Sequence, residues 1–472
     1  MQPDLVRGVA VADVGYTSTK LALYDSGGRL WAERRMPSVH HEGPPYRWID
    51  PEPIVAFFRH TLPELDAMLP VDVVVPTAHG AAMALLDADG GLALPIMDYT
   101  SEPPPDIVAA YRACMPSFAE SLCVLLPMAI THALQLFWQS RAHPEAFARA
   151  TEIIPFIQYM GYRLCGRAVI EVTSMSCQTQ LVDMAGGGFS SLLKAEGWAS
   201  RFPPMVPAWE AIGTLKPEFC GGGLRGRATV LAGVHDSSAS YARYLAAGLG
   251  DFTLLSSGTW SIAYDTTAKA AGLLEARDTA INADIFGRRV AISRFFGGKE
   301  YELAAGDAAG VPASVAAVAD LVARGTFALP SFSGSSGPVP GSALRGRFVG
   351  PPPRNAEERA SLATLYCALM VAEQLDALGG SHDVVVDGPF ARNGVMVAVL
   401  GQLRPGKAVR ASRLLDGTAA GAACLALVRN GKLPLIPIAL DDIASATIPG
   451  LAAYRQGWQA MSASNAGNEN DR

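Results

Sequence analysis

Residues 8–25 read GVAVADVGYTSTKLALYD: two apolar runs joined by a turn that carries an acid, a glycine and several hydroxyls. The apolar runs predict two strands of a hairpin. Gly15 allows close approach of the backbone, and its N–H groups could face one concavity together with the hydroxyls of Thr17–Thr19, an arrangement suited to phosphate. Lys20 adds a positive charge. Asp13 is a poor phosphate ligand but a good partner for hydrated Mg²⁺.

The same pattern returns in the second half of the chain, where residues 251–265 read DFTLLSSGTWSIAYD. Gly258 stands where Gly15 stood, and Thr259 echoes Thr17. Each turn alone could be an ordinary capped hairpin. Two turns in register with a repeated strand pattern instead indicate a duplicated domain with two phosphate turns. Neither is a Walker loop or a Rossmann fingerprint, since GxxxxGK[ST] and GxGxxG are both missing here.

Strands and helices alternate along both halves. A strand at residues 228–233 leads to His235 and Asp236, and a helix follows over residues 237–247. The region from residue 105 to 165 has a helical pattern. Asn355, with Glu358 three residues later, predicts a capped helix. This alternation is typical of the α/β class.

The bulk composition excludes several classes of protein. A chain of 472 residues predicts two or three domains. A net charge of −6 argues against nucleic acid as a partner. No apolar run is long enough to cross a membrane, and the start of the chain does not resemble a secretory signal. The seven scattered cysteines and eight histidines show no metal or disulfide spacing, so we expect reduced thiols.

DVGYTSTK, followed by VHDSSAS and LLSSGTWSI, resembles the FGGY carbohydrate kinases in order over residues 8–430, with greatest similarity to the rhamnulokinase and L-fuculose kinase group. The resemblance implies an α/β fold of two duplicated actin/hexokinase-like (ribonuclease H-like) domains with a cleft between them. It implies an N-terminal domain at 1–247, which binds sugar and carries the first phosphate loop. A nucleotide-binding domain would follow at 248–460, with a flexible tail at 461–472.

The resemblance also implies residue roles on the nucleotide side. The first phosphate loop is implied at Asp13, Gly15, Thr17, Ser18 and Lys20. The second, at the γ-phosphate, is implied at Gly258 and Thr259, and a turn against the nucleotide at Gly388 and Asn393. Mg²⁺ would lie near Asp13 and Asp236, held largely through water.

The sugar side is implied by other motifs. Asp236 takes the position of the catalytic base, with His235 beside the sugar. His79 and Gly80 fall in the N-terminal sugar loop, and Arg294 falls where relatives place a sugar contact. Asp98, in IMDYTSE, is a further candidate acceptor for a sugar hydroxyl.

The function implied is a cytoplasmic, ATP- and Mg²⁺-dependent kinase for a sugar, with a ketose such as L-fuculose or L-rhamnulose as the expected substrate. A homodimer is left open. A second hypothesis is a nucleotide-binding regulator or scaffold of the same fold that has lost catalysis. The presence of Asp236 favours the kinase.

Several positions depart from the family pattern or admit simpler interpretations. Tyr16 stands where relatives have a small residue, DGPFARN lacks the usual run of glycines, and the sugar loop PTAHGAA is altered. Asp236 could be an N-cap, and His79 a core residue. Arg294 could pair with an acid, and Lys20 could be a solvated strand residue.

Overall fold

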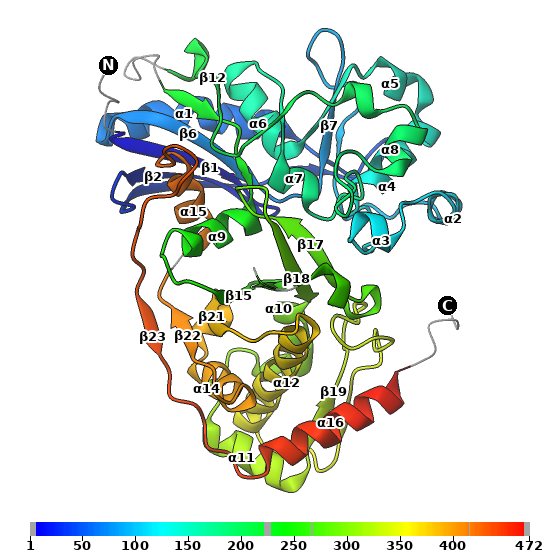
Figure 1. Ribbon diagram of the computed structural model, residues 1–472, viewed down its shortest axis with the longest axis vertical. Helices are drawn as coiled ribbons and strands as arrows, with labels where there is room; N and C mark the ends of the chain where they lie inside the picture. Colours follow the sequence, from blue (N-terminus) through cyan, green and yellow to red (C-terminus); the bar gives the residue numbers. More distant parts are fainter. Residues whose placement is uncertain (1–5, 221–227, 266, 268, 415, 467–472) are drawn as a thin grey trace. The chain divides into compact units, whose positions relative to one another are not determined.

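The computed structural model describes residues 6–220, 228–265, 267, 269–414 and 416–466 (Figure 1). The chain forms two compact units, each built from three segments. Unit 1 comprises Met1–Gly248, Ile281–Arg289 and Asp416–Pro437, and unit 2 comprises Leu249–Ala280, Val290–Leu415 and Ile438–Arg472. The chain thus returns to unit 1 twice. The division into continuous domains at 1–247 and 248–460 stays a prediction.

The central sheet of unit 1 contains the predicted opening hairpin. Its order is β12-β13-β6-β1-β2-β3, with β14 also paired to β6. β1 is antiparallel to β2 and parallel to β6. The strands are β1 (Gly8–Val14), β2 (Ser18–Asp25), β3 (Leu30–Pro37), β6 (Val71–Ala78), β12 (Ala211–Thr214), β13 (Thr229–Leu231) and β14 (Val234–His235).

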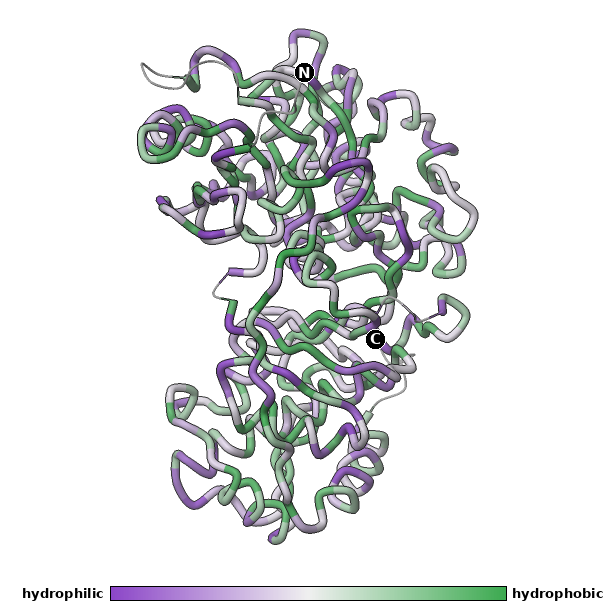
Figure 2. Tube along the Cα trace, turned by 60° about the vertical axis from the view of Figure 1, so that its left-hand side comes forward, coloured by the Kyte–Doolittle hydropathy of each residue, from purple (hydrophilic) through white to green (hydrophobic). Residues whose placement is uncertain are grey.

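Both faces of this sheet are covered, which explains why all seven residues of β1 are buried. Successive side chains alternate between the faces. Ala10 and Ala12 join the core that includes helix α1 (Pro51–Met68). Val9 and Val11 join the core on the other face, which includes α9 (Asp236–Leu245) and α15 (Gly417–Leu425). Hydrophobic segments accordingly run through the interior of unit 1 in Figure 2.

The central sheet of unit 2 begins with the second predicted hairpin. Its order is β17-β18-β16-β15-β21-β22-β23. β15 is antiparallel to β16 and parallel to β21. The strands are β15 (Phe252–Ser257), β16 (Ser261–Asp265), β17 (Thr279–Ala283), β18 (Arg289–Phe295), β21 (Asp383–Asp387), β22 (Val409–Ser412) and β23 (Leu440–Asp442).

The two sheets repeat one topology. In unit 1 the path β3-β2-β1 is antiparallel, β1-β6-β13 is parallel and β13-β12 is antiparallel. In unit 2 the path β18-β16-β15, then β15-β21-β22, then β22-β23 follows the same sequence of pairings. The duplication predicted from two short turns therefore extends over the whole sheet.

Residues 105–165 of unit 1 are mainly helical, as predicted, with one exception. A strand, β9 (Glu152–Pro155), pairs with β7 (Met83–Leu86) and interrupts the region predicted to be helical throughout. The four residues of this strand, EIIP, are too few for hydrophobic periodicity to distinguish a strand from part of a helix. The helices are α2 (Pro105–Arg112), α3 (Phe118–Ser121), α4 (His132–Ala142), α5 (Pro144–Arg149), α6 (Phe156–Cys165), α7 (Val172–Ser176) and α8 (Ser191–Ala195).

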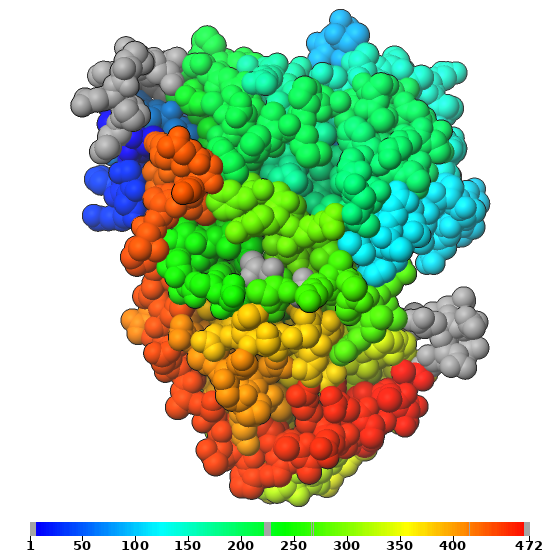
Figure 3. Space-filling view, viewed as in Figure 1, coloured from blue at the N-terminus to red at the C-terminus, as the bar shows by residue number. Residues whose placement is uncertain are grey.

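In unit 2 the long helix α12 (Ala356–Ala377) starts as predicted, because the Asn355 side chain accepts a hydrogen bond from the Glu358 N–H. α16 (Leu451–Asn465), red in Figure 3, lies on the surface and includes the first residues of the predicted flexible tail. Residues 467–472 of that tail lie outside the described residues. The other elements are α10 (Gly297–Ala305), α11 (Val315–Arg324), β19 (Phe327–Leu329), β20 (Arg347–Val349), α13 (Pro389–Arg392) and α14 (Gly394–Leu403).

Helices α9 and α15 pack closely within unit 1 (Figure 1). A Cβ atom at Gly421 of α15 would lie 1.8 Å from the carbonyl oxygen of Ala239 in α9. Because the obstacle is backbone, no side-chain rotation can relieve it. The small residues of the segment 418–427, TAAGAACLAL, therefore allow α15 to pack tightly against α9.

We expect Gly421→Ala to destabilise unit 1 by about 1–3 kcal/mol, the usual cost of overpacking. Thermal unfolding followed by circular dichroism should show a melting temperature several degrees lower. Gly334→Ala is the control, since nothing lies within 4 Å of a Cβ there, and it should melt with the wild type. Wild-type melting of Gly421→Ala would contradict the close approach of the two helices.

Candidate active site

Three parallel strands of unit 1 end at the same level of the sheet. Val14 of β1 and His235 of β14 both stand opposite Ala78 of β6. The carboxyl ends of parallel strands share one edge, the usual place for ligands in α/β folds. Gly15, His79 and Asp236, each one residue further along the chain, therefore leave the sheet together.

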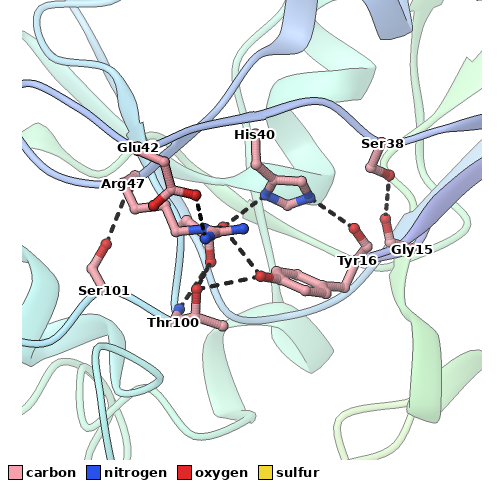
Figure 4. A network of polar contacts seen from close by, with 9 residues as sticks. Gly15, Tyr16, Ser38, His40, Glu42, Arg47, Thr100 and Ser101 are labelled. Atoms are coloured by element: carbon pink, nitrogen blue, oxygen red, sulfur yellow. Dashed lines mark hydrogen bonds and ion pairs between the residues drawn. The ribbon is translucent and has the colours of Figure 1, made fainter.

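The first turn is a tight loop held from both sides. The Gly15 N–H donates to the Ser18 carbonyl at 3.0 Å, and a Cβ at Gly15 would lie 2.9 Å from that oxygen. Ser38 donates its hydroxyl to the Gly15 carbonyl at 2.8 Å (Figure 4) and its N–H to the Thr17 carbonyl at 3.1 Å. Thr17 is exposed and Ser18 half-buried, whereas Thr19 is buried. The accessible hydroxyls are therefore those of Thr17 and Ser18.

Asp13 and Lys20 face each other across the hairpin. Their Cα atoms are register partners, and the Lys20 Nζ lies 3.0 Å from the Asp13 Oδ2. Lys20 also pairs with Asp416, which caps α15. Burial raises the pKa of Asp13 to about 6, although Lys20 opposes the shift. Burial alone would lower the pKa of Lys20, but Asp13 and Asp416 together raise it. Lys20 is thus a charged site residue, not a solvated strand residue.

Asp236 is the first residue of α9, and its side chain is 33% exposed. Its Oδ1 accepts hydrogen bonds from the Ser237 N–H at 2.5 Å and the Ser237 hydroxyl at 3.1 Å. The N-cap is His235, so the interpretation of Asp236 as the N-cap is wrong. Asp236 also acts electrostatically on Asp13 and on His79. An accessible carboxylate therefore stands at the strand ends, close to the first turn.

His235 is buried and lies between a thiol and a carboxylate. Its Nε2 is 3.4 Å from the Cys177 Sγ and 3.3 Å from the Asp236 Oδ1. Burial lowers the pKa of His235, but Cys177 and Asp236 outweigh it and raise the pKa to about 9. Asn282 donates to the Cys177 Sγ at 3.6 Å. His235 is thereby fixed beside Asp236.

His79 and Gly80 pack directly on this group. The His79 N–H donates to the Val14 carbonyl at 3.1 Å, which joins it to the end of β1. A Cβ at Gly80 would lie 2.2 Å from the His235 Cδ2, so only glycine fits there. Burial lowers the pKa of His79 to about 4, which keeps the ring neutral. Its Nδ1 has no hydrogen-bond partner among the residues that the structure describes.

Aromatic rings line the region around His79. Tyr99 lies 5.5 Å from His79 and 4.7 Å from Tyr16 between ring centroids, and Phe156 lies 5.4 Å from His79. Burial raises the pKa of Tyr99, and the nearby charge of Asp236 contributes to the same shift. These rings and the His79 nitrogen form a mixed apolar and polar surface next to the carboxylate.

Asp98 is the centre of a hydrogen-bond network whose partners His40, Arg47 and Thr100 are labelled in Figure 4. It is fully buried, with Arg47 Nε at 2.9 Å and His40 Nδ1 at 2.7 Å from its Oδ2. Thr100 donates to its Oδ1 from both the backbone N–H and the hydroxyl. Burial opposes its ionisation, but these hydrogen bonds lower the pKa of Asp98. The carboxylate is therefore ionised and surrounded by donors from the protein.

Unit 2 carries the second turn at the wall of a cavity of about 580 Å³. A Cβ at Gly298, at the start of α10, would lie 2.4 Å from the Gly258 carbonyl oxygen, so the helix closes tightly on the turn. Arg392 forms no ion pair within the described part of the chain. The cavity is lined by Gly258, Thr259, Gly298, Lys299, Tyr301, Glu302, Ala309, Pro389, Phe390, Arg392 and Asn393.

The turn after β21 is fitted against the end of β15. Gly388 has a φ of 79°, and a Cβ there would lie 1.9 Å from the Ser257 carbonyl oxygen. Asn393 caps α14 by accepting from the Met396 N–H at 3.1 Å, and its amide donates to Thr364 at 3.1 Å. One glycine at the critical position thus serves where the family pattern has a run of them.

The structure groups the predicted residues of unit 1, but Asp98 is fully buried and its carboxylate already accepts hydrogen bonds from the protein. In unit 2, Arg294 donates to Asp278 at 2.7 Å and is 4% exposed. Sequence reasoning missed Asp416, Tyr99, Cys177 and Arg392. Only Asp416 carried a signal, as an acid immediately before a small-residue helix.

A β-sheet duplicated in two units, with polar turns at equivalent strand ends, defines a two-domain α/β fold of the actin/hexokinase type. Comparison with known proteins places the chain within that class. The N-terminal domain of the FGGY family of carbohydrate kinases matches residues 9–242. The C-terminal domain of carbohydrate kinase FGGY matches residues 249–434. A sequence search of curated proteins finds no match.

Solved structures agree. A carbohydrate kinase from Novosphingobium aromaticivorans is 34% identical, with a TM-score of 0.86 over 97% of this chain and 99% of that chain. Xylulose kinase from Rhodospirillum rubrum is 21% identical, with a TM-score of 0.77 over 97% of this chain and 98% of that chain. Glycerol kinase from Plasmodium falciparum with ADP is 15% identical, with a TM-score of 0.78 over 98% of this chain and 99% of that chain.

The chain belongs to the FGGY family of carbohydrate kinases. It is therefore a phosphotransferase that uses ATP and an alcohol group as the acceptor. Within the described residues, none of the helices has the length and apolar character needed to cross a membrane.

We expect Asp13→Asn to stabilise the fold while impairing activity. The pKa of Asp13 is higher in the folded state than the ordinary 3.8, so ionisation disfavours folding. This cost is absent below about pH 4, grows up to about pH 6 and is complete above it, on the order of 2 kcal/mol. The melting temperature of the variant should therefore rise above wild type as the pH increases from 4 to 7.

The measurement is a series of thermal melts across that pH range. A variant that melts below wild type at every pH would show that the ion pair with Lys20 stabilises unit 1 by more than burial of the carboxylate costs.

Proposed function

We propose that this kinase transfers the γ-phosphate of ATP to a hydroxyl of a ketose of the L-fuculose or L-rhamnulose type, with Asp236 as general base. The observation that carries the proposal is the accessible Asp236 carboxylate at the strand ends, beside His79 and the first turn. A group that accepts a proton from substrate must be within hydrogen-bond reach of it. Of Asp13, Asp236 and Asp416, Asp236 is the one that makes no ion pair with Lys20 among the described residues.

Phosphoryl transfer requires positioning and charge stabilisation more than covalent chemistry. Asp236 accepts the proton that the sugar hydroxyl releases as its oxygen bonds to phosphorus. His235 holds Asp236 in place through the 3.3 Å contact between its Nε2 and the Asp236 Oδ1. Gly80 keeps His235 in that position.

The aromatic surface of unit 1 supports a deoxysugar as substrate. L-Fuculose and L-rhamnulose each carry a methyl group as well as several hydroxyls. Tyr99 and Tyr16, both half-buried, offer ring faces and edges for the methyl group, while the buried Phe156 packs on His79. The buried His79 Nδ1 has no hydrogen-bond partner among the described residues, and its neutral ring forms part of the wall beside Tyr99 and Tyr16.

Asp98 and Arg294 take indirect roles in this proposal. The carboxylate of Asp98 already accepts hydrogen bonds from Arg47 and from Thr100 and is fully buried, so we propose that it positions neighbouring side chains. The guanidinium of Arg294 is held by Asp278. A sugar contact from Arg294 stays a prediction.

The cavity of unit 2 is proposed to hold the nucleotide. Its volume, Gly258 of the second turn, Gly298 of α10 and its cations, Lys299 and Arg392, suit a polyphosphate ligand. Tyr301 and Phe390 offer rings to the base. Thr259 would meet the γ-phosphate, and Gly388 and Asn393 would shape the wall near the nucleotide.

The acids of unit 1 fit a magnesium ion that arrives with the nucleotide. No group of three or more acid, histidine or cysteine side chains among the described residues could hold a metal by itself. Mg²⁺ instead favours one or two carboxylates, several waters and substrate phosphates. We propose that Asp13 and Asp236 hold it, largely through water. The ion would offset negative charge on the phosphate groups.

The cellular context is proposed on indirect grounds. All seven cysteines are free, which suits the reducing cytoplasm where ATP is abundant. A homodimer stays a prediction that sedimentation velocity can test.

We expect ADP release by the purified protein to be stimulated most by L-fuculose or L-rhamnulose in a panel with D-xylulose, gluconate and glycerol. Asp236→Asn should lower kcat at least about a hundredfold, because general base catalysis is lost. ATP binding, measured by calorimetry, should be unchanged.

Asp106→Asn is the matched control, since Asp106 is also an acid in the first turn of a helix in unit 1. It should turn over like wild type. Wild-type turnover of Asp236→Asn would remove Asp236 as the base. Absence of stimulation by every compound would contradict the ketose assignment and favour the regulator hypothesis.

We also expect Thr259→Val to lower kcat by about tenfold to a hundredfold, as loss of one donor to a transferring phosphate does. The KM for the sugar should stay within about twofold, since the sugar is proposed to bind in unit 1. Steady-state kinetics with the best sugar of the panel gives both values. Thr151→Val, at another exposed threonine, is the control. Equal losses in kcat and sugar affinity would contradict a role at the γ-phosphate.

A further inference from the structure

Tyr16 belongs to the first phosphate turn, yet its side chain leaves that turn. Its hydroxyl lies 3.3 Å from the Asp98 Oδ2 and 3.3 Å from the Thr100 Oγ1 (Figure 4). We propose that Tyr16 is a positioning residue that ties the first phosphate turn to the Asp98–Thr100 segment of the sugar surface, so that a bound sugar sets the turn for transfer. The inference rests on the proposed function.

A second link joins the same two segments. The His40 Nε2 lies 2.9 Å from the Tyr16 carbonyl oxygen, and its Nδ1 lies 2.7 Å from the Asp98 Oδ2. Both ring nitrogens face oxygen acceptors, so both contacts are hydrogen bonds only when the ring carries two protons. The ring of Tyr16 also packs on His40, with 4.6 Å between centroids. Side chain and backbone of Tyr16 are therefore both fixed to Asp98.

Asp98 is a firm anchor for these links. Its oxygens also accept from the Arg47 Nε at 2.9 Å and from the Thr100 N–H at 2.9 Å. Arg47 in turn pairs with Glu42 at 2.6 Å, and the Ser101 hydroxyl donates to the Arg47 carbonyl. Hydrogen bonds to a charged, buried acceptor are stronger than neutral ones. The position of Tyr16 is thus determined by the network and not by the turn alone.

The proposed sugar-binding surface is formed by Tyr99 and His79, and it lies beside the ring of Tyr16. Tyr99 follows Asp98 and packs on the ring of Tyr16 with 4.7 Å between centroids. His79 meets Tyr16 edge-on at 6.3 Å. A sugar that binds to Tyr99 and His79 therefore acts on side chains that pack directly on Tyr16. Through the backbone of Tyr16, that contact reaches Gly15 on one side and Thr17 on the other.

Without Tyr16 the turn would keep fewer restraints. The Gly15 N–H to Ser18 hydrogen bond closes it, and Ser38 holds it from the β3 side. Neither bond involves the sugar surface. A small residue at position 16 would lack any side chain able to reach Asp98. The coupling is therefore a property of this chain's tyrosine.

The test is Tyr16→Phe, which keeps the ring and removes the hydroxyl. Tyr162→Phe is the matched control, because the Tyr162 hydroxyl donates to the Gly90 carbonyl at 3.0 Å, in contacts that the proposed site does not use. The first readout is hydrogen exchange of the backbone amides of residues 15–18 in the full chain without ligands. The second is kcat and KM with L-rhamnulose and L-fuculose.

For Tyr16→Phe we expect exchange in the turn to be several-fold faster and kcat to fall about tenfold, the effect of losing a hydrogen bond to a charged group. The KM for sugar should stay within about twofold, because the ring remains. Thr100→Val, which removes another partner of the same hydroxyl, should act in the same direction. The control should match wild type in both readouts.

Unchanged exchange in the turn, or faster exchange with unchanged kcat, would overturn the inference. A fall in kcat with an equal rise in sugar KM would also overturn it, since that pattern indicates a direct sugar contact. If wild type responds to no sugar, the proposed function fails, while hydrogen exchange still decides whether Tyr16 holds the turn.

Discussion

The register of three parallel strands is the constraint on which the site depends. Because Val14 and His235 both align with Ala78, the residues that follow them leave the sheet at one level. A shift by one residue in either pairing would turn each side chain to the opposite face. Burial of β1 on both faces fixes that register, since the alternating apolar residues fill two different cores. The catalytic geometry is therefore a consequence of packing far from the reacting atoms.

Duplication explains why two short sequences were enough to predict a repeated domain, whereas the fold itself was implied by the family resemblance. Each hairpin is a local pattern, and its parallel neighbour follows from the same strand order in both units. Sequence reasoning failed where a structure depends on distant segments. Asp416 meets Lys20 only because the chain returns to unit 1, and α15 can pack there because residue 421 is glycine. The strand β9 was missed because a segment of four residues is too short to show a strand or helix period.

The candidate site shows the same division between local and distant information. The accessible hydroxyls, the glycines and Asp236 follow from their own motifs. The hydrogen-bond partners of the Tyr16 side chain cannot be predicted from its motif, because they lie far away in the sequence. Asp98, for example, is 82 residues further along the chain. Asp98 illustrates the converse. An acid in a polar motif resembles a substrate ligand, and only the donors around it reveal that its hydrogen-bonding capacity is already used.

Charge balance explains why the nucleotide would bring its own cation to this site. Near the first turn lie the carboxylates of Asp13, Asp236 and Asp416, and Lys20 pairs with Asp13 and Asp416. The pKa of Asp13 is raised because the cost of burying its charge is larger than the stabilisation that the Lys20 ammonium provides. Adding a polyphosphate would make the excess of negative charge larger. Glycines and hydroxyls can orient phosphate oxygens, but they supply no net charge. In the proposed site, the Mg²⁺ that arrives with the nucleotide would offset this excess near the first turn, because the positive charges of Lys299 and Arg392 belong to the cavity of unit 2.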